Sequence, residues 1–274
     1  MAAPLRVATP PYLVARPLRE GLGEEPGIEL TDAVPARLVE GLRSGQLDVA
    51  LVSSIELFRQ PGYSYIAGPA VAGRGAVRSV QVFRRKPLAE LRTLALDPAS
   101  RAAATLVQIV LPRRTGAPVE FLSTELGTDP RAARGADGWL RIGDAALCET
   151  FAEDAPATFN PSAAWAQDTG LPFVFAVWVV RAGVTLSPEH LAAFARAQAR
   201  GALSLEALAQ EGSTSWGLEL EHCRRYLLEE CCFDVGTDTA PALAAFRDAA
   251  AALDLCESGL TPTALELPGT PCPR

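Results

Sequence analysis

The first third of the chain alternates short apolar runs with stretches of helical spacing. Apolar residues recur at helical spacing from Pro35 to Ser44, and Gly45 then supplies a stop signal. A shorter helix is indicated from Ala15 to Gly21. Three apolar runs indicate strands: Leu5 to Ala8, Ile28 to Thr31 and Leu47 to Val52. Strands that alternate with helices predict a parallel sheet, because parallel neighbours need a crossover connection.

The pattern continues further along and then changes. A helix is indicated from Ser100 to Leu111. Six more segments indicate strands: Tyr65 to Val71, Ala76 to Phe83, Leu94 to Leu96, Pro118 to Leu122, Gly138 to Ile142 and Phe173 to Val180. After Val180 only helices are expected, with no strand between them: Pro188 to Gln210, Leu218 to Cys232 and Pro241 to Leu255. The chain therefore begins as α/β and ends as a helical part.

This order predicts two lobes, the second inserted into the first. We expect lobe one to comprise residues 1–92 plus 178–274, and lobe two residues 93–177. The strands Val77 to Phe83 and Phe173 to Val180 would be the crossing segments. Such an arrangement is typical of type 2 periplasmic-binding-protein-like folds, which close by a hinge on a ligand in the interlobe cleft.

The composition of the chain indicates which classes of binding partner to expect. A net charge of −7 disfavours nucleic acid, since phosphate binding needs a basic stripe. No apolar run approaches the roughly 20 residues that span a bilayer, and Met1 to Val7 lack a signal-peptide core, so we expect no membrane contact and a cytoplasmic location. The six cysteines form no CxxC pair, and Cys231-Cys232 falls inside a helical pattern, where a core role is expected. We expect no metal and no cofactor; the sequence does not indicate the oligomeric state.

Candidate chemistry lies in the loops at the carboxyl ends of strands, where α/β sheets bind ligands. These loops carry the following residues: Thr9, Tyr12, Ser53, Ser54, Ser79, Ser100, Arg101, Gly143 and Asp144. Ser53, Ser54, Ser100 and Asp144 are each suited to capping a helix N-terminus. Several helix N-termini that converge on one cleft would also hold an anion. Both interpretations stay open and are compatible. No GxGxxG, P-loop, HExxH or GxSxG motif occurs, and both histidines lie in the helical C-terminal part.

Several segments together resemble the chorismate dehydratase family of the futalosine route to menaquinone. They are Tyr12-Leu13-Val14-Ala15-Arg16-Pro17-Leu18, Gly45 to Ser54, Val77-Arg78-Ser79-Val80, Ala95-Leu96-Asp97 with Ser100-Arg101, Ile142 to Leu147, and Thr169 to Trp178. The resemblance implies a hydro-lyase that converts chorismate into 3-[(1-carboxyvinyl)oxy]benzoate without a cofactor. It implies a dicarboxylate substrate held in the cleft.

The resemblance also implies the roles of individual residues. Ser79 and Asp144 are the expected catalytic residues. Substrate binding is expected from Thr9, Tyr12, Val14, Ser53, Ser54, Ser79, Ser100, Arg101, Gly143 and Asp144. No general base is evident, so the substrate's own carboxylate is one candidate for that role. A sister family that cleaves a cyclic futalosine derivative carries a histidine where Gly143-Asp144 stands, which argues against that activity here.

Three departures from the family pattern favour an alternative. Val14 stands where the family has a polar Asn, Ala102 to Ala104 replace a stretch rich in hydroxyls, and Asn160-Pro161-Ser162 replace an Asp-Leu-Gly. Valine cannot form the hydrogen bond of an amide. A non-catalytic small-carboxylate binder of the same fold is therefore the second hypothesis.

Overall fold

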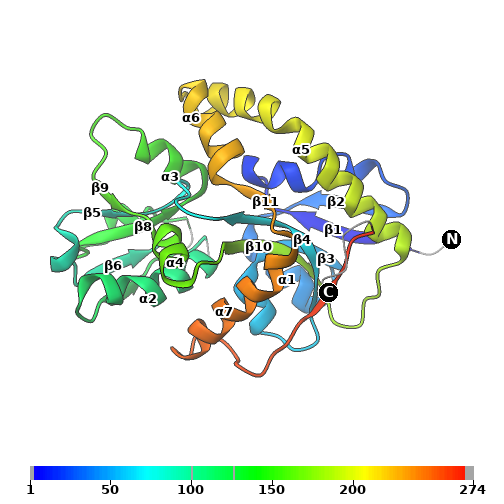
Figure 1. The fold of residues 1–274 in the computed structure, drawn as a ribbon, viewed down its shortest axis with the longest axis horizontal. Helices are drawn as coiled ribbons and strands as arrows, with labels where there is room; N and C mark the ends of the chain where they lie inside the picture. The colour runs from blue at the N-terminus through cyan, green and yellow to red at the C-terminus, as the bar shows by residue number, and fades with distance from the viewer. Residues whose placement is uncertain (1–2, 100, 126, 269–274) are drawn as a thin grey trace.

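Two β-sheets form the centres of two lobes that lie side by side (Figure 1). The structure is a computed structural model that describes residues 3–99, 101–125 and 127–268. In Figure 1 the second lobe lies to the left and the first, which holds both ends of the chain, to the right.

The first sheet has the strand order β11-β4-β10-β3-β1-β2, and β12 also pairs with β4. Its strands are β1 (Leu5–Thr9), β2 (Ile28–Asp32), β3 (Val49–Ser53), β4 (Ser64–Gly73), β10 (Phe173–Val180), β11 (Cys232–Asp234) and β12 (Thr263–Leu265). Strand β1 runs parallel to β2 and β3, as the strand–helix alternation predicts. Strand β10 runs antiparallel to both β3 and β4, because it returns from the second lobe.

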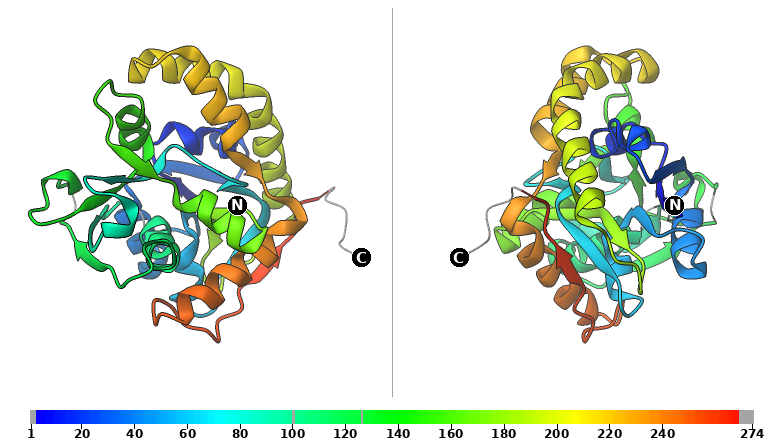
Figure 2. Two further views of the ribbon diagram at one scale, coloured as in Figure 1. Left: turned by 60° about the vertical axis from the view of Figure 1, so that its left-hand side comes forward. Right: turned by 90° about the vertical axis from the view of Figure 1, so that its right-hand side faces the viewer.

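Helices cover both faces of this sheet (Figure 2). Strand alternation decides which face each residue supports: Trp178 packs on Phe194 of α5 (Pro188–Trp216) with 5.0 Å between ring centroids, while Val177 joins the core on the opposite face. That opposite face carries α1 (Pro35–Ser44) and α7 (Thr239–Ala251). The α5 helix ends before Gly217 and is followed by α6 (Leu220–Arg224), which runs directly into the π-helix η6 (Arg225–Glu230). Short 3-10 helices η1 (Leu13–Leu18) and η3 (Ser54–Phe58) follow β1 and β3.

The second sheet has the order β7-β6-β8-β5-β9. Its strands are β5 (Val80–Arg84), β6 (Thr93–Leu96), β7 (Glu120–Ser123), β8 (Gly138–Ile142) and β9 (Ala157–Phe159). Its helices are α2 (Arg101–Thr115), α3 (Gly143–Thr150) and α4 (Pro161–Thr169). Phe83 and Trp139 stack at 5.7 Å on one face, and Leu106 of α2 packs into the core on the other.

The chain changes sheet earlier than the predicted limits. Strand β5 pairs with β8 and β9 in the second sheet, although residues 80–84 were expected in lobe one. All of β10 pairs within the first sheet. We therefore propose that the lobes divide at residues 74–79, here called the crossing loop, and at residues 170–172, in place of 92–93 and 177–178.

One prediction for the helical C-terminal part is wrong. Strand β11 follows η6 directly and pairs with β4, so a strand does lie among the last helices, and Cys231-Cys232 end the helical segment instead of lying inside it. Strand β10 pairs with one edge of β4, which leaves the backbone N–H and C=O groups of the other edge without partners from β10. The three residues of β11 form hydrogen bonds with part of that edge. Within the part of the chain that the structure describes, no helix is long and apolar enough to cross a membrane.

Candidate active site

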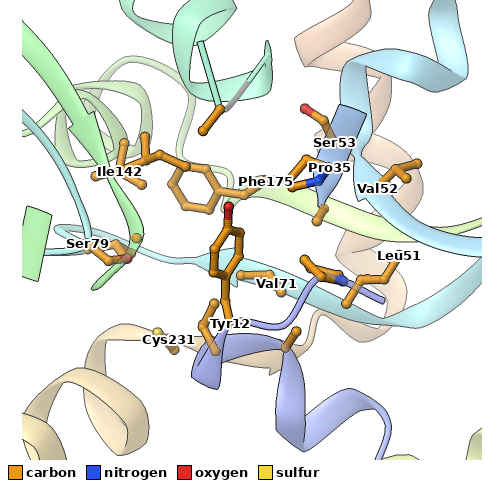
Figure 3. A pocket seen from close by; sticks show the side chains of 18 of the residues that line it. Tyr12, Pro35, Leu51, Val52, Ser53, Val71, Ser79, Ile142, Phe175 and Cys231 are labelled. Atoms are coloured by element: carbon orange, nitrogen blue, oxygen red, sulfur yellow. The ribbon is translucent and has the colours of Figure 1, made fainter. Parts of the chain in front are cut away.

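A cavity lies where the two lobes meet (Figure 3). It encloses about 780 Å³ of space, including its open mouth. Its walls come from both lobes and from the C-terminal helical part: Pro10, Tyr12, Val14, Ala15, Pro35, Leu51, Val52, Ser53, Val71, Val77, Ser79, Val80, Ala99, Ile142, Gly143, Phe175, Ala176, Tyr226 and Cys231. This main cavity is mostly apolar, and none of these lining residues carries a charged side chain.

Tyr12 extends from the start of η1 into the main cavity. Its backbone is extended (φ −80°, ψ 147°), and its phenol points toward Phe175 (Figure 3). Among the described residues its hydroxyl has no hydrogen-bond partner, so it is available to a ligand. Burial raises the pKa of Tyr12, and the carboxylates of Asp97 and Asp144 raise it further. The phenol is therefore a neutral donor at physiological pH.

Ser53, another residue of the cavity wall, forms a hydrogen bond between the two lobes. Its Oγ accepts the backbone N–H of Ala102, in the first turn of α2, at 2.7 Å. One residue earlier, Arg101 reaches Glu56 of η3 at 3.6 Å. Glu56 is fully buried and receives two hydrogen bonds from Arg43, at 2.7 and 3.0 Å. The N-terminus of α2 in lobe two is thus attached to the end of β3 in lobe one.

Ser79 lies at the end of the crossing loop and faces the main cavity (Figure 3). Its Oγ lies 2.9 Å from the phenol oxygen of Tyr226, which donates to it. Its backbone carbonyl accepts the N–H of Gly143, the first residue of α3, at 2.8 Å. Because Gly143 also lines the cavity, the positive end of the α3 dipole faces the space for a ligand.

A second, more polar hollow adjoins the main cavity and shares Tyr12, Ala99, Ile142 and Gly143 with it. Asp97 and Asp144 both line this adjoining hollow. Burial raises the pKa of Asp97, although its carboxylate accepts the N–H groups of Ala99 at 2.9 Å and Ile142 at 3.2 Å. Burial also raises the pKa of Asp144, opposed by a hydrogen bond from Trp216. The carboxylates nearest the cavity are therefore easier to protonate than ordinary ones.

The next question is whether the described residues offer ligands for a metal ion. Among the residues with described positions, no group of three or more His, Cys, Asp or Glu could hold an ion. The site instead offers hydroxyls and a helix end in apolar walls, which suits a small ring compound with oxygen substituents.

Residues 5–252 match the model of a protein family described as menaquinone biosynthesis. The chain belongs to this family. The chorismate dehydratase of Thermus thermophilus is 34% identical over 194 residues, which are 65% of this chain and 70% of that protein. The family membership predicted from the sequence is confirmed.

Solved structures match the fold at low identity. Protein AF1704 from Archaeoglobus fulgidus gives a TM-score of 0.72 at 16% identity, with 91% of this chain and 97% of that one covered. The alkanesulfonate-binding protein SsuA from Xanthomonas axonopodis pv. citri, bound to MOPS, gives 0.69 at 16% identity, with 97% and 100% covered. A Candida albicans gene product, CA3427, has the generic periplasmic binding protein fold and gives 0.57 at 12% identity, with 98% and 99% covered. The predicted periplasmic-binding-protein-like fold is confirmed.

Half of the predicted site residues in this family member line the main cavity: Tyr12, Val14, Ser53, Ser79 and Gly143. Asp144 lines the adjoining hollow, and Arg101 lies at the lobe junction. Ser100 lies outside the described residues. For each of these, contact with a ligand stays a prediction.

Thr9 and Ser54 do not line the main cavity. Thr9 donates to Asp32 at 2.9 Å and accepts from Arg19 at 3.0 Å. Ser54 is fully buried, and its hydroxyl donates to the carbonyl of Val174 at 2.6 Å. Both hydroxyls are thus engaged within lobe one.

Sequence reasoning missed several residues of the cavity wall. Phe175 was expected only as part of a buried strand, and Tyr226 and Cys231 only as parts of a helix. For Phe175 the family segment Thr169 to Trp178, which contains it, was a usable signal. For Tyr226 none existed, since 147 positions separate it from Ser79.

One departure from the family pattern has a structural role. Asn160 caps α4 by accepting the N–H of Ala163 at 2.9 Å, and its amide donates to the carbonyl of Val77 at 2.9 Å. Ser162 donates to the carbonyl of Gly75 at 2.6 Å. These replacements hold the crossing loop that carries Ser79. Val14, by contrast, contributes only apolar surface to the cavity.

Proposed function

We propose that this chain dehydrates chorismate to 3-[(1-carboxyvinyl)oxy]benzoate, as a hydro-lyase of the menaquinone biosynthesis family. One observation carries the proposal: four segments that resemble the family each contribute a residue to the wall of the same cavity. These residues are Tyr12, Ser53, Ser79 and Gly143. The name of the Thermus thermophilus relative supports the choice of substrate. The ligand would be a small dicarboxylate.

The cavity suits the demands of this reaction. Chorismate loses one ring proton and one hydroxide, together one water, and the ring becomes aromatic. Apolar walls exclude bulk water and strengthen the few polar contacts. The hydroxyls of Tyr12 and Ser79 would donate to substrate oxygens, and the α3 N-terminus at Gly143 would favour a carboxylate. A donor placed at the departing hydroxide stabilises the charge that develops there.

Two groups are candidates for the proton acceptor. No imidazole or carboxylate belongs to the described lining of the main cavity. Asp144 is the nearest predicted catalytic carboxylate, in the adjoining hollow, and its raised pKa makes it a stronger base than an ordinary aspartate. The substrate's own carboxylate is the other.

The direct test is incubation of the purified protein with chorismate. We expect a product whose mass is lower by one water and whose absorption is that of an aromatic enol ether. Boiled protein controls for the spontaneous decay of chorismate. Stabilisation of the protein by chorismate without any product would instead support the non-catalytic binder, the function that Val14 in the cavity wall favours.

A further inference from the structure

We propose that Tyr226 is the positioning residue for Ser79, and that it turns the Ser79 proton toward the ligand. This inference rests on the proposed dehydratase function. It assigns a part in the site to the C-terminal helical segment.

The geometry makes the Tyr226 hydroxyl the donor and Ser79 Oγ the acceptor of one hydrogen bond. The phenol of Tyr226 donates to Ser79 Oγ at 2.9 Å, and both side chains are buried, with 2% and 6% of their surface exposed. A serine hydroxyl has one proton and two lone pairs. The bond from Tyr226 occupies one lone pair. The Ser79 proton has no acceptor among the described residues, and Ser79 lines the main cavity, so an oxygen of the ligand is its natural acceptor.

The surroundings of Tyr226 favour this direction of donation. Burial raises the pKa of Tyr226 well above its usual value, so the phenol keeps its proton. Burial raises the pKa of the neighbouring Cys231 thiol to about 12, opposed by a side-chain hydrogen bond with Tyr226. A phenol that keeps its proton can donate it to Ser79 Oγ, which lies 2.9 Å away and lines the main cavity.

The backbone near Ser79 is held from the same helical segment. Glu230, four residues after Tyr226, accepts the backbone N–H of Arg78 at 2.9 Å and forms an ion pair with its guanidinium. Tyr226 and Glu230 belong to the π-helix η6, and π-turns occur frequently at functional sites. The widened segment thus holds two consecutive residues of the crossing loop. Gly143 holds the Ser79 carbonyl from lobe two.

This arrangement predicts an effect on rate more than on binding. A donor that is already oriented costs no reorganisation when charge develops on the departing hydroxide. Without Tyr226, the Ser79 hydroxyl would rotate freely and donate less often in the productive direction. The contribution would appear mainly in kcat.

The experiment is a double-mutant cycle with Tyr226→Phe and Ser79→Ala. The phenylalanine keeps the ring and removes only the hydroxyl. We expect Tyr226→Phe to lower kcat by roughly 10-fold while KM changes by less than about 2-fold. In the Ser79→Ala background the same change should have no further effect. Tyr65→Phe, at another buried tyrosine of lobe one outside the cavity lining, should keep native kcat.

Melting temperatures separate packing from positioning. A purely structural role for Tyr226 would lower the melting temperature and give losses that add to those of Ser79→Ala. Additive losses, or native kcat in Tyr226→Phe, would overturn the inference. If the native protein makes no product, the proposed function fails by itself. The cycle is then measured on the dissociation constant of chorismate. The inference there requires a small weakening, within about 2-fold, that is equal in the two single variants and does not add in the double variant. No weakening, or an additive one, overturns it.

Discussion

The Oγ atom of Ser53 accepts the backbone N–H of Ala102 at 2.7 Å, although the two residues belong to different lobes. Helix α2 is therefore capped from outside its own lobe. An N-cap acceptor satisfies one of the free N–H groups of the first turn. Two-lobed folds of this kind open and close by a hinge, so we expect this hydrogen bond to form when the lobes close.

Replacing Ser53 with alanine should weaken closure. We expect a loss of about 1 kcal/mol in stability, the usual cost of an N-cap, and weaker binding of chorismate. Ser187→Ala is the matched control, since Ser187 caps α5 within lobe one at 3.2 Å and lies outside the cavity lining. Both variants should melt earlier, but only Ser53→Ala should change the dissociation constant. Equal binding by the two would contradict the interlobe role.

Val14→Asn should restore the amide that the family carries at this place in the cavity wall. A hydrogen bond made fully only in the transition state raises the rate without tightening binding. We expect kcat for chorismate to rise by roughly 10-fold, the effect of one such donor. The comparison variant is Val14→Thr, which places a smaller polar group at the same position of the cavity wall. A native chain that is already as fast as Val14→Asn would show that Val14 is only packing.

Tyr12→Phe should remove a phenol hydroxyl that points into the cavity and, among the described residues, has no hydrogen-bond partner. If this hydroxyl replaces the missing amide, we expect a loss of roughly 10-fold or more in kcat/KM, since a hydrogen bond to a charged partner contributes about 1.5–3 kcal/mol. Its raised pKa also predicts that the donor persists up to and beyond pH 10. Tyr63→Phe, outside the cavity lining, is the control. Native kcat/KM in Tyr12→Phe would rule out the replacement.

Asp144→Asn distinguishes the two candidates for the proton acceptor. If Asp144 accepts the ring proton, the variant should lose roughly 100-fold in kcat, the scale of general-base catalysis. The native rate should then rise with pH through a pKa above that of an ordinary aspartate, because burial raises the pKa of Asp144. We expect this result. A variant with native kcat would instead assign the role to the substrate's own carboxylate.

Asp137 provides a prediction for stability against pH. Its carboxylate binds Lys86 at 2.5 Å and accepts the N–H groups of Arg92 and Thr93, which lowers its pKa to about 2. A folded pKa below the unfolded value of about 4 stabilises the protein above pH 4, and this contribution is lost as the pH falls toward 2. Asp137→Asn should cost about 1 kcal/mol at pH 7, since water screens the half-exposed Lys86.

Chemical denaturation at several pH values checks this. The difference between native protein and Asp137→Asn should shrink between pH 4 and pH 2. Glu153→Gln, an exposed carboxylate, should match the native protein throughout. A difference that stays constant down to pH 2 would contradict the assigned pKa.

Local patterns in the sequence determined much of the fold. Apolar runs and helical spacing predicted β1, α1 and β3, and their parallel pairing follows from a crossover helix, which is a local connection. Gly45 ends α1 with φ 77°, a conformation that glycine adopts without strain. The family resemblance rests on the same kind of local segment. These features are encoded by residues close together in the chain.

The tertiary structure alone decided which residues form the site. Ser53 faces the cavity while its neighbour Ser54 is buried against Val174, because β3 ends and η3 begins between them and successive side chains diverge there. Strand β11 exists because β4 offers it an edge, and its three residues carry no periodic signal of their own. Tyr226 meets Ser79 only because the final helices pack beside the crossing loop. Contacts between distant segments depend on how whole elements pack, and no local pattern in the sequence specifies that.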